Sequence, residues 1–394
     1  MRQAFAITAS RIFDGHQFHE DAALFVESGR VKAILRKADL PADILRQDAG
    51  DALIAPGFID LQVNGGGGVL FNNDPTVTGI RTICEAHARY GTTALMVTLI
   101  TDAPEIKRQA IAAGEAAARA GEPGYLGLHL EGPHLSIARK GTHDPALIRP
   151  MAQADLDYLV AQAQHFGISM ITVAPESVTP DQVKRLVEAG YRVSLGHTDT
   201  SCANVEPYVD AGATLVTHLF NAMSPLGNRE PGLVGAALTS PILHCGLIAD
   251  GFHVDPVTMK IALAAKTGPA HIFLVTDAMS TIGTDQTGFD LNGRAVYRRD
   301  GRLTLADGTL AGADIDMLSC VRYVHEKLGQ PLEEALRMAS LYPAEAIGAP
   351  NKGKLAAGQH ADFVVLGPDL DIHSTWIAGT CVFAKRTEPS RAFA

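Results

Sequence analysis

Four polar residues each follow a short apolar run of the chain, and their side chains are of types that bind metal ions or transfer protons. They are Glu131 after "LGLHL", His197 after "VSLG", His218 after "TLVT" and Asp277 after "IFLVT". Two imidazoles and one carboxylate are a common set of ligands for a catalytic zinc ion, with a fourth position left for water. A further carboxylate beside such a set can act as an acid or a base. The pattern therefore indicates a metal-dependent catalytic site.

Each of the four residues also has a purely structural interpretation when it is considered alone. A histidine at a strand end is usually a hydrogen-bonded core or loop residue. Glu131 could cap a turn or pair with a base, and Asp277 could be the N-cap of the segment that begins "AMST". Their shared position at the ends of apolar runs favours a common site, because a barrel would direct all four side chains into one cavity.

The elements that would position these residues alternate along the chain between position 55 and about position 350. Eight apolar runs are typical of buried strands, and they cover residues 56–63, 94–99, 125–131, 168–173, 192–196, 214–218, 243–250 and 271–277. Helical patterns lie between them, and those at 76–91, 103–121 and 179–190 end in glycine. Strands that alternate with helices form a parallel sheet, and eight such units predict a closed (β/α)8 barrel in an α/β protein. A doubly wound open sheet is the alternative.

The two ends of the chain have a different pattern from the middle. Residues 1–54 and 354–394 contain alternating segments joined by glycine-containing turns, and neither end alone has enough strands for a stable sheet. We therefore expect the two ends to pair into one small β-sandwich domain, with residues 55–353 forming the barrel domain. Residues 285–312 are expected to form a β-hairpin insertion near the mouth of the barrel.

Bulk composition limits the classes of partner. The 394 residues carry a formal net charge of −10, which argues against nucleic-acid or anionic-membrane binding, so an anionic ligand would need local positive groups. The first residues have no apolar core long enough for a signal peptide, and no apolar run reaches the ~20 residues of a membrane span. Five scattered cysteines without a CxxC arrangement are typical of reduced thiols. These features predict a cytoplasmic protein.

Eight short motifs occur in an order that resembles one enzyme family. They are "LQVNGGGG", "HLEGPHL", "KGTHDP", "LGHTDT", "THLFNAMSPL", "REPG", "ADGFHV" and "LVTDAM", and the chain is similar through them to the N-acetylglucosamine-6-phosphate deacetylases of the amidohydrolase superfamily. The resemblance implies metal-dependent hydrolysis of N-acetylglucosamine 6-phosphate to glucosamine 6-phosphate and acetate. N-acetylgalactosamine 6-phosphate, or another N-acyl hexosamine phosphate, is an alternative substrate. A non-catalytic sugar-phosphate-binding barrel is disfavoured, because a barrel that has lost catalysis has no physical need for all four strand-end residues.

The resemblance also implies a role for each matching residue. Glu131, His197 and His218 correspond to the ligands of a single metal ion, and Asp277 corresponds to the catalytic base and acid. His143, in "KGTHDP", corresponds to the residue that binds the acetyl carbonyl group. The residues that correspond to the sugar-phosphate site are Asn221, Ala222, Arg229 and His253. In the family, phosphate anchors come partly from the neighbouring subunit, so a homodimer with this site near the interface is expected.

Gln62 and Asn64 occupy positions where many metal-dependent hydrolases have two histidines one residue apart. Family members with the histidine pair can hold two metal ions, and members with glutamine and asparagine hold one. The resemblance therefore implies one divalent metal ion per subunit. Zinc is the preferred ion, and Fe²⁺, Co²⁺ and Mn²⁺ are also compatible. Gln62 could contact a water molecule bound to this metal, whereas Asn64 is expected to stabilise the loop. A dihydroorotase is disfavoured, because the histidine pair is missing.

Overall fold

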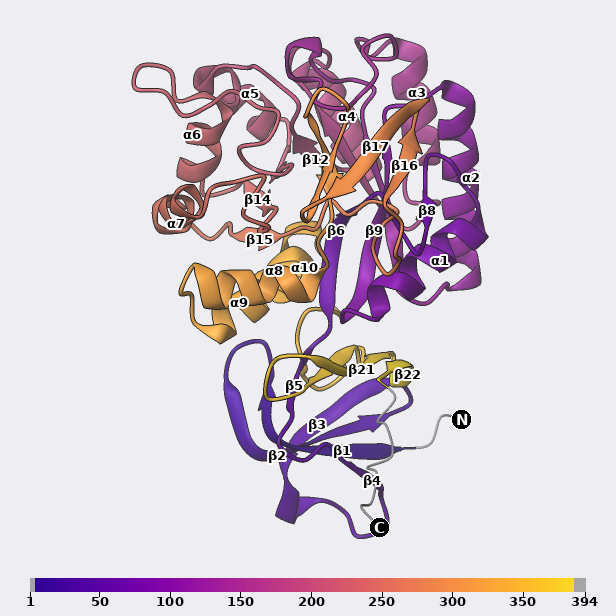
Figure 1. Ribbon diagram of the computed structural model, residues 1–394, viewed down its shortest axis with the longest axis vertical. Helices are drawn as coiled ribbons and strands as arrows, with labels where there is room; N and C mark the ends of the chain where they lie inside the picture. The colour runs from indigo at the N-terminus through magenta and orange to yellow at the C-terminus, as the bar shows by residue number, and fades with distance from the viewer. Residues whose placement is uncertain (1–3, 386–394) are drawn as a thin grey trace.

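Eight parallel strands form the barrel predicted from the sequence, in the computed structural model, which describes residues 4–385 (Figure 1). In the sheet they follow the order β15-β14-β13-β12-β11-β10-β9-β6. Their bounds are β6 (Phe58–Val63), β9 (Thr92–Ile100), β10 (Tyr125–Glu131), β11 (Ile168–Val173), β12 (Arg192–Leu195), β13 (Leu215–Val216), β14 (His244–Leu247) and β15 (Ile272–Leu274). The ring closes at the carboxyl end, where the Asp277 N–H donates to the Gln62 carbonyl at 2.9 Å and the Asn64 N–H donates to the Ala278 carbonyl at 2.8 Å.

The strands are continuous apolar runs because helices cover the outside of the barrel while side chains fill its inside. All nine residues of β9 are buried, for example. The helices are α1 (Val77–Ala88), α2 (Pro104–Ala120), α3 (Gln153–Gln162), α4 (Pro180–Ala189), α5 (Glu206–Asp210), α6 (Gly232–Thr239), α7 (Pro256–Ala265), α8 (Met317–Arg322), α9 (Leu332–Ala339) and α10 (Leu341–Ile347). Short helical turns are η1 (Lys37–Asp39), η2 (Ile137–Arg139), η3 (Cys202–Asn204) and η4 (Tyr323–Lys327). Within residues 4–385, none of the helices has the length and apolar character needed to cross a membrane.

Local signals in the sequence explain where the helices begin and end. In α4, the Thr179 hydroxyl accepts the backbone N–H of Gln182, whose side chain accepts the Thr179 N–H in return, so two unpaired donors of the first turn are satisfied. The same helix ends at Gly190, which has a φ of 106° and occupies the left-handed region that favours glycine. The predicted boundary of 179–190 therefore agrees with the structure.

The two chain ends form one sheet outside the barrel, as predicted (Figure 1). Its strands are β1 (Phe5–Phe13), β2 (Phe18–Glu27), β3 (Arg30–Arg36), β4 (Leu45–Asp48), β5 (Leu53–Pro56), β20 (Phe363–Leu366), β21 (Ile372–Ile377) and β22 (Thr380–Ala384). The expected sandwich is a single eight-stranded sheet in which β5 pairs with both β1 and β20. It has its own apolar core, which includes Phe363 and Trp376. Residues 1–3 and 386–394, which belong to the small domain expected from the sequence, lie outside the described residues.

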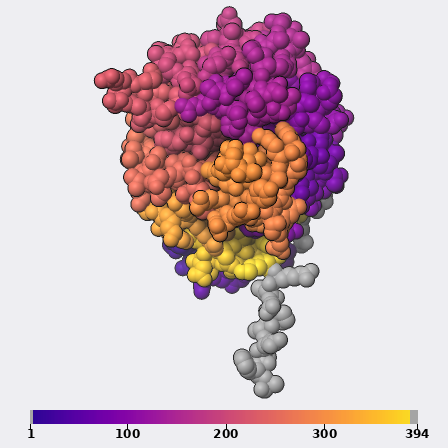
Figure 2. Space-filling view, turned by 45° about the horizontal axis from the view of Figure 1, so that its top comes forward, coloured from indigo at the N-terminus to yellow at the C-terminus, as the bar shows by residue number. Residues whose placement is uncertain are grey.

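The insertion is larger than the expected hairpin. It forms a four-stranded antiparallel sheet of β16 (Gly288–Leu291), β17 (Arg294–Arg299), β18 (Arg302–Thr304) and β19 (Leu310–Ala313). Its buried residues share an apolar cluster with Ile100 at the end of β9 and with Met279 after β15. A smaller pair, β7 (Gly65–Gly66) with β8 (Val69–Leu70), lies in the glycine loop after β6. The orange atoms of the insertion cover part of one barrel face in Figure 2.

Candidate active site

A cavity of about 240 Å³ lies at the carboxyl ends of the barrel strands. Nine of the residues singled out in the sequence line this cavity, namely Asn64, Glu131, His143, His197, His218, Asn221, Ala222, His253 and Asp277. The carboxyl ends of barrel strands all face the same side, so residues as far apart along the chain as Asn64 and Gly312 meet there. Gln62 is buried at the base of the same region, and Arg229 does not line the cavity.

Three candidate ligand atoms converge at one point of the cavity. Glu131 Oε1 lies 3.2 Å from His197 Nε2 and 3.1 Å from His218 Nε2, and the two imidazole nitrogens are 3.1 Å apart. Atoms that bind one zinc ion tetrahedrally at about 2.0–2.1 Å are separated by about 3.3–3.4 Å, so this triangle has the dimensions of a metal shell. Burial raises the pKa of Glu131, but the adjacent rings of His197 and His218 outweigh this effect and hold the pKa well below its usual range.

The ring of His197 is oriented for metal binding by the loop that carries His143. His197 Nδ1 donates to the backbone carbonyl of Arg139 at 2.8 Å, so its proton lies on that nitrogen and Nε2 keeps a lone pair. The Arg139 side chain in turn pairs with Asp199 at 2.7 Å, which ties the same loop to the segment after His197. The donor set of two nitrogens and one ionised carboxylate therefore fits a divalent metal ion.

Unusual backbone conformations turn these side chains toward the cavity. His197, His218 and Asp277 have φ values of 49°, 30° and 51°, although none of them is a glycine. Such left-handed residues cost of order 1–3 kcal/mol each and are concentrated at functional sites. Gly196 is required before His197, because a Cβ atom there would lie 2.9 Å from Cβ of Thr217 on the neighbouring strand end.

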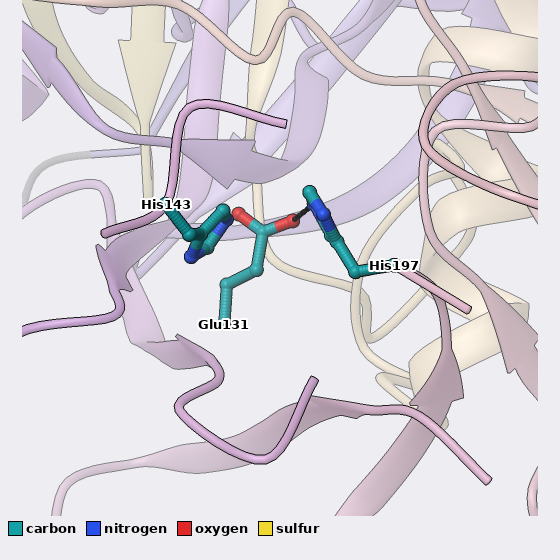
Figure 3. A group of neighbouring side chains, drawn as sticks. All are labelled: Glu131, His143 and His197. Carbon is teal, nitrogen blue, oxygen red and sulfur yellow. Dashed lines mark hydrogen bonds and ion pairs between the residues drawn. The ribbon is translucent and has the colours of Figure 1, made fainter. Parts of the chain in front are cut away.

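His143 offers a second possible grouping, since one ligand atom each of Glu131, His143 and His197 lie within 4.8 Å of one another (Figure 3). His218 fits the third ligand position better than His143, because its contacts with Glu131 and His197 are shorter. The hydrogen bonds of His143 also place its proton on the nitrogen that faces the cavity. The backbone N–H of Thr101 donates to His143 Nδ1 at 3.3 Å, and the Thr101 hydroxyl lies 2.7 Å from the same nitrogen. The proton of neutral His143 is therefore on Nε2, which makes that atom a donor rather than a metal ligand. Burial lowers the pKa of His143 to about 3, so the ring is neutral near pH 7.

Asp277 lies beside the ligand triangle and is held by two side-chain amides. Asn64 Nδ2 donates to Asp277 Oδ1 at 2.7 Å, and Gln62 Nε2 donates to the same oxygen at 3.1 Å. Gln62 Nε2 also lies 3.3 Å from both carboxylate oxygens of Glu131, so its amide connects the two carboxyl groups. Burial, together with the negative charge of Glu131, raises the pKa of Asp277 to about 6. A carboxyl group with that pKa can both accept and return a proton near neutral pH.

The polar end of the cavity contains Asn221, Ala222 and His253. His253 Nδ1 lies 2.6 Å from Asp250 Oδ2, which fixes the ring and leaves Nε2 for a ligand. Arg229 is exposed in the loop before α6, and among residues 4–385 no arginine or lysine lines the cavity. Oε1 of the neighbouring Glu230 accepts the backbone N–H groups of Cys202 and Gly232, and within residues 4–385 no ion pair joins this carboxylate to Arg229.

Two residues of the site were not identified as functional from the sequence. Asn64 was expected to stabilise its loop, and the structure adds a hydrogen bond from its side chain to Asp277. Thr101 follows the apolar run of β9 directly, so the strand-end pattern that identified Glu131 could also have found it. Its small hydroxyl gave no chemical reason to choose it until the fold brought it to His143.

Comparisons with known proteins show which family the whole chain resembles. The Amidohydrolase family profile matches residues 53–382, and the NagA composite domain profile matches residues 4–54. The chain is 45% identical over 330 residues to the N-acetylgalactosamine-6-phosphate deacetylase of Shewanella sp. (strain ANA-3), covering 84% of this chain and 83% of that protein. It is 37% identical over 354 residues to the N-acetylglucosamine-6-phosphate deacetylase of Rattus norvegicus, with 86% and 85% covered.

Solved structures show the same similarity over nearly the whole chain. The N-acetylglucosamine-6-phosphate deacetylase from Pasteurella multocida superposes with a TM-score of 0.93 at 34% identity, covering 97% of this chain and 100% of the other. A mutant of the Mycobacterium smegmatis deacetylase, in complex with N-acetyl-D-glucosamine-6-phosphate, superposes with a TM-score of 0.90 at 32% identity, covering 96% and 99%. The barrel and the small sheet domain are therefore both shared with these enzymes.

Proposed function

This chain belongs to the amidohydrolase family, and from that premise we propose that it hydrolyses the N-acetyl group of N-acetylglucosamine 6-phosphate. The products are glucosamine 6-phosphate and acetate, so the enzyme acts in amino-sugar catabolism. The relatives that match most of its length are deacetylases of N-acetylhexosamine 6-phosphates. The observation that carries the proposal is the convergence of Glu131, His197 and His218 on one point next to Asp277.

Amidohydrolases are metal-dependent, and the ligand set proposed here is Glu131, His197 and His218, holding one divalent ion per subunit. We propose zinc, because two imidazole nitrogens and one carboxylate suit it; iron, cobalt and manganese remain alternatives for metal analysis to separate. When bound, such an ion polarises the acyl carbonyl and lowers the pKa of water toward 7, so that hydroxide is available at neutral pH.

The protein's own residues supply the remaining chemistry. His143 Nε2–H donates to the acetyl carbonyl oxygen and stabilises the negative charge that develops there, an effect typically worth about 3–4 kcal/mol for one such donor. Asp277 accepts the proton of the attacking water and delivers it to the amide nitrogen as the carbon–nitrogen bond breaks. Asn64 and Gln62 bind only Oδ1 of Asp277 among the contacts in the described chain, so Oδ2 is available for proton transfer. Gln62 thus lies between the two carboxyl groups where the attacking water is expected.

The sugar phosphate is proposed to bind at the polar end of the cavity, through Asn221, the backbone of Ala222 and the His253 ring. Because no lysine or arginine of the described chain lines that cavity, the exposed Arg229 is proposed to reach the phosphate in a neighbouring subunit. Arginine suits this position because its planar fork binds phosphate through two hydrogen bonds. This arrangement requires a homodimer, which we propose together with a cytoplasmic location.

N-acetylgalactosamine 6-phosphate is the second candidate substrate. One specific observation favours it: the Shewanella relative that acts on the galactose-configured sugar is 45% identical to this chain, whereas the rat relative that acts on the glucose-configured sugar is 37% identical. The two sugars differ only at C4, far from the reacting amide. The mechanism above applies equally to both.

Metal analysis and acetate release together test the proposal. The purified protein is expected to contain about one equivalent of a divalent metal and to release acetate from at least one of the two N-acetylhexosamine 6-phosphates. A Glu131→Gln variant serves as the control, since it removes the charged ligand but keeps the side-chain size. Stoichiometric metal without acetate release from either sugar phosphate would contradict the proposed function.

A further inference from the structure

Three large apolar residues that line the cavity lie beside or within the insertion, whereas a fourth, Ile248, follows β14. Ile100 stands at the end of β9, Met279 follows β15, and Leu310 begins β19 of the insertion. Ile100 and Met279 are 5% and 2% exposed and belong to the apolar cluster that forms the core of the insertion. The insertion therefore completes this wall of the cavity, and we call Ile100, Met279 and Leu310 the apolar wall.

The apolar wall is connected directly to the residues proposed to handle the acetyl group. Ile100 precedes Thr101, whose backbone and hydroxyl bind His143. Met279 stands two residues after Asp277, and the Ala313 N–H of β19 donates to the Asp277 carbonyl at 2.9 Å. The Arg294 guanidinium of β17 also donates to the carbonyl of Thr142, the residue before His143. The chain segments that carry both proposed catalytic residues are thus bonded to the elements that form the wall.

The polar residues proposed for the sugar phosphate come from different strand ends. Asn221 and Ala222 follow β13, and His253 follows β14. In the ring of strands, β9, β6 and β15 form one arc, whereas β13 and β14 lie on the next arc beyond β15. We expect a substrate whose amide lies between His143 and Asp277, and whose phosphate points to His253, to direct its acyl tail toward the apolar wall.

We infer that the apolar wall, and Leu310 in particular, determines which acyl group the enzyme removes by leaving space for a methyl group but not for a longer chain. The inference rests on the proposed deacetylase function and adds acyl-length selectivity to it. Leu310 is the best residue to test, because it is half-buried at the beginning of a strand, whereas Met279 packs against Gly312 so closely that a Cβ there would lie 2.6 Å from the Met279 side chain. One methylene group in an apolar pocket changes selectivity about 10- to 200-fold.

The test compares kcat/KM for N-formyl, N-acetyl and N-butyryl glucosamine 6-phosphate in the metal-loaded enzyme. Wild-type protein is expected to prefer acetyl over butyryl by at least about 10-fold. Leu310→Ala is expected to raise the butyryl-to-acetyl ratio by about 10-fold or more, because it removes most of the side chain that meets the tail. Leu310→Phe is expected to act in the opposite direction and to lower kcat/KM for the acetyl substrate relative to the formyl substrate by about 10-fold.

Leu305→Ala is the matched control, since Leu305 is another half-buried leucine of the insertion that packs against its core but does not line the cavity. Its acyl ratios should equal those of wild type. Equal ratios in wild type and Leu310→Ala, or the same rise in Leu305→Ala, would overturn the inference while deacetylation itself remained. Failure of the wild-type enzyme to release any of the three acyl groups would instead refute the proposed function on which the inference rests.

Discussion

Truncation of Asn64 tests directly whether Asp277 acts as the base. Asn64 Nδ2 donates to Asp277 Oδ1 at 2.7 Å, and this is the shorter of the two amide contacts with that oxygen. Because an amide N–H stabilises the ionised carboxylate, Asn64→Ala should raise the pKa of Asp277 above its wild-type value. A base must be ionised to work, so the acidic limb of the pH profile should shift upward.

The size of the shift follows from the strength of the lost contact. Hydrogen bonds to charged groups contribute about 1.5–3 kcal/mol, and one pKa unit corresponds to about 1.4 kcal/mol. Complete loss of the contact would therefore raise the pKa of Asp277 by about 1–2 units. Gln62 still donates to Asp277, and water can enter the space left by the amide, so we expect about 1 unit. Activity on the acidic limb should then fall about 10-fold, with a much smaller loss at alkaline pH. Asn64→Asp should shift the limb further in the same direction, because it places a second negative charge beside the base.

The assay is kcat for acetate release measured from pH 5 to pH 9, with metal content determined for each variant. Asn204→Ala is the control, because Asn204 also donates its side-chain amide, to Thr200 at 2.8 Å, but does not line the cavity. Its profile should coincide with that of wild type. If Asn64→Ala and Asn64→Asp both kept the wild-type acidic limb while retaining metal, the assignment of that limb to Asp277 would be refuted.

Three further predictions follow from the same geometry. Asp277→Asn can still accept from Asn64 and Gln62, so it should retain its metal while kcat falls at least about 100-fold; a variant within 10-fold of wild type would remove Asp277 from its role. Arg229→Ala should raise KM for the phosphorylated sugar far more than for unphosphorylated N-acetylglucosamine, and equal increases would contradict phosphate anchoring. Burial raises the pKa of Asp60 from 3.8 to about 7, so the folded state favours its protonated form. The resulting contribution to stability is present at low pH and is lost as pH rises from about 4 to about 7, by up to about 4 kcal/mol. In urea unfolding of the metal-free protein, Asp60→Asn should therefore lose less stability than wild type between pH 5 and pH 8, and parallel pH curves would show that Asp60 does not titrate in this range.

The barrel was predictable because its strands and helices carry strong local signals. Buried parallel strands are apolar on both faces, and glycine or proline marks the helix boundaries, so even β13 and β15, with two and three residues, stand out as apolar runs. The insertion was only partly predictable. Its strands are three to six residues long and its core depends on Ile100 and Met279, which lie outside it in the sequence. When the apolar partners of a short segment are remote in the sequence, the local pattern indicates the turns of that segment but not all of its strands.

Candidate site residues could be proposed at strand ends because closure of a barrel brings all carboxyl ends to one side. This rule located Glu131, His197, His218 and Asp277 without distances, and the structure brings all four to one cavity. It could not separate a metal ligand from a hydrogen-bond donor, since that depends on which ring nitrogen carries the proton. For His143 the answer comes from Thr101, which is 42 residues away along the chain.

The amino-acid sequence by itself determined the alternation of strands and helices, the small number of strands at each chain end and the residue types available at each strand end. Those properties depend on apolar periodicity and turn chemistry, which act over a few neighbouring residues. Only the tertiary structure decided the 3.1–3.2 Å triangle of ligand atoms, the contact of Asn64 with Asp277, the contribution of Leu310 to the cavity and the exclusion of Arg229 from it. These depend on how the closed barrel sets strands and loops from remote parts of the chain against one another, and no local preference encodes a distance between atoms so far apart in sequence.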